Sequence, residues 1–101
     1  MLIQINTDHN ITVHDAYNDK LTDLLIDELK RFSTNITRLE LHLSDENGPK
    51  KGVKDKKCSL EARLAGRKPL GVSDLADTYD LAVKGAIDKM KKVLDTTLSK
   101  Q

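Results

Sequence analysis

Apolar residues recur at three- and four-residue steps in two stretches of the chain. At 100° per residue each set falls on one face, so the pattern predicts two amphipathic helices. We expect the first to open with Thr12 as its N-cap and to end at the polar run 33–35, and the second to span 73–98 with Asp74 as its N-cap. The expected buried positions are Tyr17, Leu21, Leu24, Leu25, Leu29 and Phe32 in the first helix, and Leu75, Tyr79, Val83, Ala86, Ile87, Met90, Val93 and Leu94 in the second.

Elsewhere the polar and apolar positions alternate, which is typical of strands with one face toward solvent. The pattern predicts strands at 2–6, 36–44 and 58–64, and a short edge strand at 70–72, where Pro69 fits because it cannot donate to a ladder. Clean alternation favours an antiparallel sheet. We expect Thr37, Leu39, Leu41 and Leu43 to face the core, and Arg38, Glu40, His42, Glu61 and Arg63 to face water.

The predicted element order is therefore β-α-β-β-β-α. A four-stranded sheet with both helices on one face makes a two-layer α+β domain. With 101 residues, the chain is long enough for one core, so we expect residues 1–101 to form a single domain.

Positive charge is concentrated in one segment, although the net charge is only +1. Residues 50–68 hold eight basic side chains against Asp55 and Glu61. Such a patch can bind nucleic-acid phosphates, whereas a solvated polar loop is the alternative explanation for 50–57. The Lys and Asp residues of the last helix could equally pair with one another. The expected phosphate contacts are Lys50, Lys51, Lys54, Lys56, Arg67, Lys68, Lys89 and Lys92.

The sequence offers little for catalysis. His9, His14 and His42 lack the spacing of a metal site, and no glycine pattern suits a phosphate-cradling loop. Cys58 falls on an inward strand position, where a small buried side chain is expected. We therefore expect no enzyme activity, cofactor, metal or small-molecule substrate. The three aromatic side chains lie on apolar stripes, so any RNA would be recognised by shape and backbone charge.

No apolar run is long enough to cross a membrane, and the N-terminus lacks a basic segment followed by an apolar one. These features predict a cytoplasmic protein.

Three segments resemble the hibernation-promoting factor and ribosome-associated inhibitor A family: Leu43–Gly48, Cys58–Gly66 and Ala82–Lys89. The resemblance covers essentially the whole chain. It implies a fold related to double-stranded-RNA-binding domains, binding to rRNA of the small ribosomal subunit where messenger and transfer RNA sit, and silencing of translation without chemistry. Because the chain ends at Gln101, we expect the short form, without the C-terminal dimerisation domain of the long form.

A second hypothesis comes from the first helix, which is acidic. Its solvent face carries Asp19, Asp23, Asp27 and Glu28. The alternative function is therefore a non-catalytic protein-interaction module of the same fold, in which this helix serves a protein partner. Sedimentation with ribosomal subunits at low and high salt separates the two hypotheses, because phosphate contacts weaken with salt.

Overall fold

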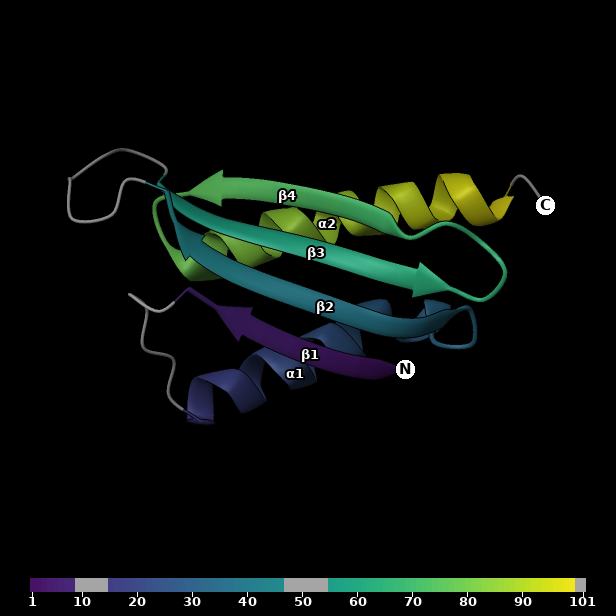
Figure 1. Cartoon of the computed structure of the whole chain (residues 1–101), viewed down its shortest axis with the longest axis horizontal. Helices are drawn as coiled ribbons and strands as arrows, with labels where there is room; N and C mark the ends of the chain where they lie inside the picture. Colours follow the sequence, from purple (N-terminus) through teal and green to yellow (C-terminus); the bar gives the residue numbers. More distant parts are fainter. Residues whose placement is uncertain (9–14, 47–54, 100–101) are drawn as a thin grey trace.

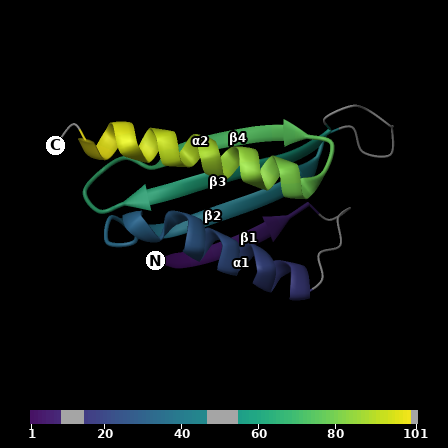
Figure 2. The ribbon, with the colours of Figure 1, turned by 180° about the vertical axis from the view of Figure 1, so that it is seen from behind.

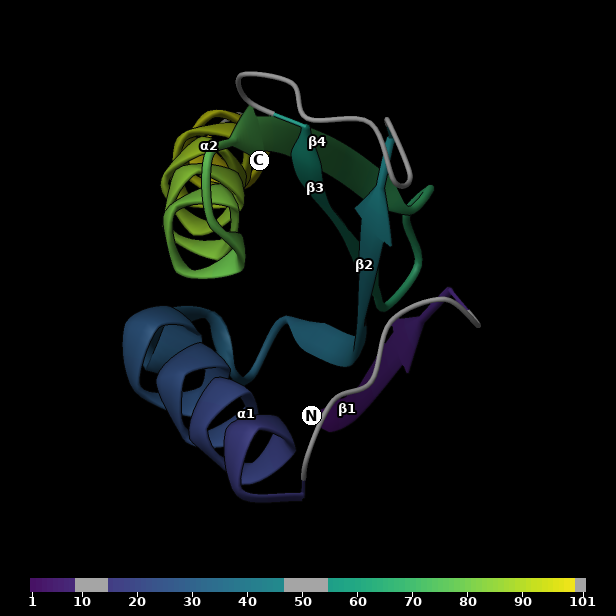
Figure 3. The same cartoon turned by 90° about the vertical axis from the view of Figure 1, so that its left-hand side faces the viewer.

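The fold has two layers, a sheet and a pair of helices that cover one of its faces (Figures 1 and 3). The computed structural model describes residues 1–8, 15–46 and 55–99. It confirms the expected α+β order. The elements are β1 (Leu2–Thr7), α1 (Asp15–Leu29), a 3-10 helix (Lys30–Phe32), β2 (Ile36–Asp45), β3 (Lys56–Leu64), β4 (Leu70–Ala76) and α2 (Tyr79–Ser99).

The sheet is mixed, with the strands in the order β1-β2-β3-β4. β2, β3 and β4 pair antiparallel, as expected, whereas β1 pairs parallel with β2. The expectation of an antiparallel sheet is therefore wrong for β1. β1 and β2 are parallel because α1 connects them and carries the chain back to the end of the sheet where β1 began.

The buried face of β2 differs from the expected one at a single position. A bulge between Ile36 and Arg38 shifts the register against β3. Ile36 therefore enters the core, and Thr37 stays exposed while its hydroxyl donates to the carbonyl oxygen of Arg63 over 3.1 Å. A bulge places two residues opposite one, so alternation alone cannot predict which of them turns inward.

One continuous core lies between the sheet and the helices, and it consists mainly of leucine. Leu21, Leu25 and Leu29 from α1 are buried in this core, as the helical spacing predicts. Tyr17 and Leu24 are partly buried at its border. The other buried residues are Phe32, Ile36, Leu39, Leu41, Leu43, Cys58, Leu60, Ala62, Leu64, Ala82, Val83, Ala86, Ile87, Met90 and Leu94.

The two helices run in the same direction, side by side (Figure 2). Polar side chains join them at both ends. The hydroxyl of Tyr17 donates to Asp80 over 2.8 Å, and Arg31 bonds Asp95 over 2.9 Å. Between them Lys91 bonds Glu28, also over 2.9 Å. Partners are 63 or 64 residues apart in each pair, so the helices keep one register along their shared length.

The second helix begins later than the sequence predicts. Residues 73–76 belong to β4, where Ser73 pairs with Ser59 and Asp74 with Cys58. The N-cap is Thr78, whose side-chain oxygen accepts the N–H of Leu81 over 3.2 Å. Leu75 therefore lies on the open face of the sheet and is 47% exposed. Residues 70–76 alternate as a strand does, although Leu75 also fits the helical spacing of the apolar residues that follow it.

Asp74 instead links β4 to α2. It is an inward-pointing charge on an edge strand, a device that discourages pairing with further strands. Gly85 on α2 lies so close that a Cβ at this position would be 1.7 Å from Oδ2 of Asp74. The Nζ of Lys89 lies 3.0 Å from Oδ1 of Asp74 and donates to the carbonyl oxygen of Ser73 over 2.8 Å.

The contact between Gly85 and Asp74 predicts that Gly85→Ala changes the free energy of unfolding in opposite directions with and without the Asp74 side chain. Gly85→Ala alone is expected to lower the free energy of unfolding by about 1 kcal/mol, because the methyl group displaces the Asp74 carboxylate and outweighs the gain in helix propensity. With Asp74→Ala present, the same change is expected to raise it by about 1 kcal/mol. Urea denaturation of the four proteins measures the coupling. Equal effects in both backgrounds would show that the close approach has no energetic weight.

Candidate nucleic-acid interface

The open face of the sheet carries the expected charged residues, but their charges cancel. Arg38 lies opposite Arg63 and Glu40 lies opposite Glu61 across β2 and β3. Like charges therefore face each other, and the ion pairs run along each strand: Arg38 to Glu40 over 2.8 Å and Arg63 to Glu61 over 3.4 Å. Arg63 therefore pairs along its own strand, since its direct neighbour across the strands is another arginine.

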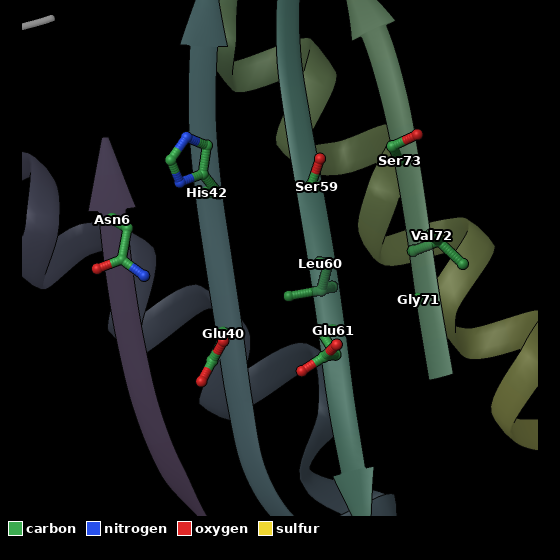
Figure 4. A pocket seen from close by; sticks show the side chains of 9 residues that line it. All are labelled: Asn6, Glu40, His42, Ser59, Leu60, Glu61, Gly71, Val72 and Ser73. Carbon is green, nitrogen blue, oxygen red and sulfur yellow. The ribbon is translucent and has the colours of Figure 1, made fainter. Parts of the chain in front are cut away.

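Beside these pairs the open face is hollowed, and residues of all four strands line the hollow (Figure 4). Gly71, which pairs with Glu61, has no side chain to fill the space. The carboxylates of Glu40 and Glu61 line the hollow on adjacent strands, together with small polar side chains such as Ser59 and Ser73. A surface with acidic groups at its centre disfavours phosphate, so the open face is not the candidate RNA site.

At the end of the sheet where β2 leads into β3, ion pairs hold the two strands together. The Nζ of Lys56 lies 3.0 Å from Asp45 and 3.4 Å from Asp55, whose side chain is only 7% exposed. The hydrogen bond to Asp45 raises the pKa of Lys56, so this lysine is charged. Lys57 pairs with Glu46 over 3.2 Å. Lys56 is therefore engaged within the chain.

Lys89 is engaged in the same way, by Asp74 and Ser73. Two of the eight predicted phosphate contacts thus hold the fold together. The sequence shows that acidic residues are near, but not which lysine each one meets, because these pairs form across strands or between a strand and a helix.

Three predicted contacts remain without an ion pair in the part of the chain that the structure describes, and they lie at the opposite end of the sheet. Arg67 and Lys68 are exposed in the β3–β4 turn, where Gly66 supplies a φ of 71°. Lys92 is exposed on the C-terminal half of α2, which lies at the same end of the molecule (Figures 1 and 2). We call Arg67, Lys68 and Lys92 the basic corner.

The spacing along α2 places Lys92 on the flank toward β4. It follows Gly85 by seven residues and Lys89 by three, and both of these face Asp74. Thr96, one turn further, lines with Lys92 a shallow hollow of about 240 Å³ and adds a hydroxyl donor. A lysine, an arginine and hydroxyl groups are the donors that phosphate oxygens accept from.

The other predicted contacts, Lys50, Lys51 and Lys54, lie outside the described residues. Lys84 is also exposed and has no ion pair within the described ranges 1–8, 15–46 and 55–99, but it lines a groove between the two helices rather than the basic corner. No signal in the sequence separates it from its paired neighbours.

The surroundings of His42 and Cys58 indicate structural roles for both side chains. The Nε2 of His42 lies 2.8 Å from Asp8, and no group of three metal-ligating residues occurs within the described part of the chain. Cys58 is fully buried, and burial, followed by the charge of Asp74, raises the pKa of its thiol to about 12. The thiol is therefore neutral and inaccessible, which does not suit a nucleophile.

This buried thiol predicts a loss of stability in alkali. The raised pKa means that the folded state favours the protonated thiol, so its contribution is complete below the ordinary value of 9.0 and is lost as pH rises from there toward about 12. Between pH 8 and pH 10 the free energy of unfolding is expected to fall by about 1 kcal/mol. Denaturation of Cys58→Val, expected to show a flatter dependence over this interval, is the check; an equally steep fall would contradict it.

None of the helices among the described residues has the length and apolarity that a membrane crossing requires.

Comparison with known proteins adds a family and two similar structures. Residues 3–101 match the family described as sigma 54 modulation protein / S30EA ribosomal protein. The structure is similar to the N-terminal domain of Protein Y from Thermus thermophilus, with a TM-score of 0.74 and 17% identity over 96% of this chain and 99% of that one. It is equally similar to a ribosomal subunit interface protein from Coxiella burnetii, with a TM-score of 0.74 and 17% identity over 98% and 99% of the two chains. No curated protein sequence matches the chain.

Proposed function

Because the chain belongs to the sigma 54 modulation protein / S30EA ribosomal protein family of non-enzymatic, ribosome-associated factors, we propose that it silences translation by occupying the messenger and transfer RNA region of the small ribosomal subunit. The contacts are with phosphates of the ribosomal RNA, and the protein acts in the cytoplasm. The name of the Coxiella burnetii relative, a ribosomal subunit interface protein, supports this location on the ribosome.

The observation that carries the proposal is the basic corner. Most described basic side chains have a carboxylate partner, whereas Arg67, Lys68 and Lys92 gather at one end of the molecule without one. Such a group sets a local positive field despite a net charge of +1. Each phosphate that these side chains neutralise releases counterions, which drives association.

The predicted phosphate contacts also fall into two groups, one beyond each end of β3. The segment with Lys50, Lys51 and Lys54 joins β2 to β3 at the Lys56 end of β3, and the basic corner lies beyond Leu64 at the other end. At about 3.3 Å per residue, β3 spans about 30 Å. We propose that lysines of the 50–54 segment and the basic corner contact separate stretches of RNA, so that the sheet bridges them and blocks the space between.

Inhibition then needs no chemical step. The protein competes for space with messenger and transfer RNA, and its strength depends on affinity and concentration. Neither the open sheet face nor the buried thiol takes part.

Sedimentation with purified small subunits tests the proposal. We expect the protein to sediment with the subunit at low salt and to be released at high salt. If three or more phosphates are contacted, the logarithm of the binding constant should fall with the logarithm of the salt concentration with a slope of about −2 or steeper. Absence of co-sedimentation at low salt, or retention independent of salt, would contradict the proposal.

Competition tests the place of binding. Subunits loaded with the protein are expected to bind less messenger RNA and transfer RNA in a filter assay, in proportion to occupancy. Full binding of both RNAs to saturated subunits would place the protein elsewhere on the ribosome.

A further inference from the structure

The two edges of the sheet are protected differently. β4 is preceded by Pro69 and carries the inward charge of Asp74, both of which discourage further pairing. β1 has neither feature: the residues of Leu2–Thr7 are uncharged and include no proline. Among the residues that the structure describes, β1 pairs with β2 only, so its second edge has no strand partner there.

The open edge of β1 has free backbone groups. The N–H of Asp8 donates to the carbonyl oxygen of Leu43 on β2 over 3.2 Å. Since backbone groups alternate in direction along a strand, the even-numbered residues point toward β2. Ile3, Ile5 and Thr7 therefore direct their N–H and C=O groups outward, where an added strand would bond them.

The flank of α1 beside this edge is apolar at one end and acidic at the other. Asp15, Asp19, Thr22 and Ile26 follow one another at four- and three-residue steps, so they form one line along the helix. The residues of α1 that contact α2, such as Tyr17 and Glu28, lie on the opposite side. This line therefore faces away from α2, on the β1 side of the molecule (Figure 2).

The direction of the chain orders the line along β1. α1 runs opposite to β1, so Ile26 lies toward the Leu2 end and Asp15 toward the Thr7 end (Figures 1 and 2). Leu2 is 70% exposed and Ile26 48% exposed. The edge thus offers exposed apolar side chains at one end and carboxylates at the other.

We infer that the β1 edge binds an extended, lysine- or arginine-containing segment of a protein, which adds to the sheet as a fifth strand. Its backbone pairs with Ile3, Ile5 and Thr7. Of its side chains that point toward the helix layer, apolar ones cover Ile26 and basic ones reach Asp15 and Asp19.

Charge decides between this occupant and others. A second copy paired through β1 across a two-fold axis would place the acidic end of each α1 beside the Ile26 end of the other, so it would bring no basic group to Asp15 and Asp19. RNA would meet the same carboxylates. A basic polypeptide is complementary to the acidic end and needs only backbone pairing elsewhere.

The test uses the protein alone, without RNA, so it is independent of the proposed function. The probe is a fluorescent peptide of about nine residues with threonine at every second position. Of the positions between the threonines, the first two are lysine and the last two are valine. A second peptide has the same sequence in reverse order. We expect one order to bind saturably, and amide hydrogen exchange of Ile3, Ile5 and Thr7 to slow about tenfold at saturation. The same peptide N-methylated on its pairing edge is expected not to bind.

Matched variants locate the contact. Asp19→Lys and Ile26→Glu are expected to weaken peptide binding about fivefold each. Asp27→Lys and Leu81→Glu, the same changes on other exposed faces, are expected to leave it unchanged. The inference is overturned if neither peptide binds up to millimolar concentration, if binding leaves exchange at β1 unchanged, or if the protein alone forms a dimer through this edge.

Discussion

Replacing Arg67, Lys68 and Lys92 together by glutamate is expected to weaken binding to the small ribosomal subunit at least about a hundredfold. Charged hydrogen bonds to phosphate contribute about 1.5 to 3 kcal/mol each, and three are replaced by repulsion. The salt dependence should become shallower by about 0.9 logarithmic units for each phosphate that the variant no longer neutralises. Titration of labelled protein with purified subunits, at several salt concentrations, measures both quantities.

The matched control reverses the same number of charges elsewhere. Lys20 and Lys84 are exposed cations in the groove between the helices, and Lys30 is an exposed cation just after α1; none of the three belongs to the basic corner. Their replacement by glutamate changes the net charge equally, so an affinity close to that of the unaltered protein is expected. If both triple variants lose the same affinity, net charge rather than the basic corner governs binding. Circular dichroism verifies that each variant is folded.

Lys56→Met is expected to lower the free energy of unfolding by about 2 kcal/mol at pH 7. The change leaves Asp45 and Asp55 close together without the cation that both approach, and Asp55 is buried. Breaking a fully buried pair costs about 3 to 5 kcal/mol, and the loss expected here is smaller than that range because Lys56 is 27% exposed. Urea denaturation of both proteins at pH 7 gives the difference.

Lys57→Met is the control, because the adjacent lysine pairs with the more exposed Glu46. A loss below about 0.5 kcal/mol is expected there. The comparison of these two variants also decides whether Lys56 contacts RNA. If Lys56→Met keeps its stability and loses subunit affinity about tenfold, Lys56 is a phosphate contact and not a support of the hairpin.

The regular spacing of apolar residues predicts most of the fold correctly. The stripe through Leu21, Leu25 and Leu29 and the alternation through Leu39 and Leu41 both enter the core, because burial is what fixes these periods. The predictions fail where two periods overlap. Residues 73–76 fit either the end of a strand or the first turn of a helix, and pairing with β3 decides between them.

The candidate site was less predictable, because charge pairing depends on tertiary contacts. Lys56, Lys89 and Lys92 look alike in the sequence, yet two have carboxylate partners and the third has none in the part of the chain that the structure describes. Asp74 meets Lys89 only because Gly85 lets the helix approach the edge strand. The sequence predicts a basic region, and the folded contacts separate its lysines with carboxylate partners from those without one among the described residues.

The basic corner also has a consequence for the newly synthesised protein. Its members come from the β3–β4 turn and from α2, so the group is assembled only when α2 has been translated and has packed on β3 and β4. A nascent chain that has exposed Arg67 and Lys68 still lacks Lys92. On the proposed function, full affinity for RNA therefore requires α2 to be in place.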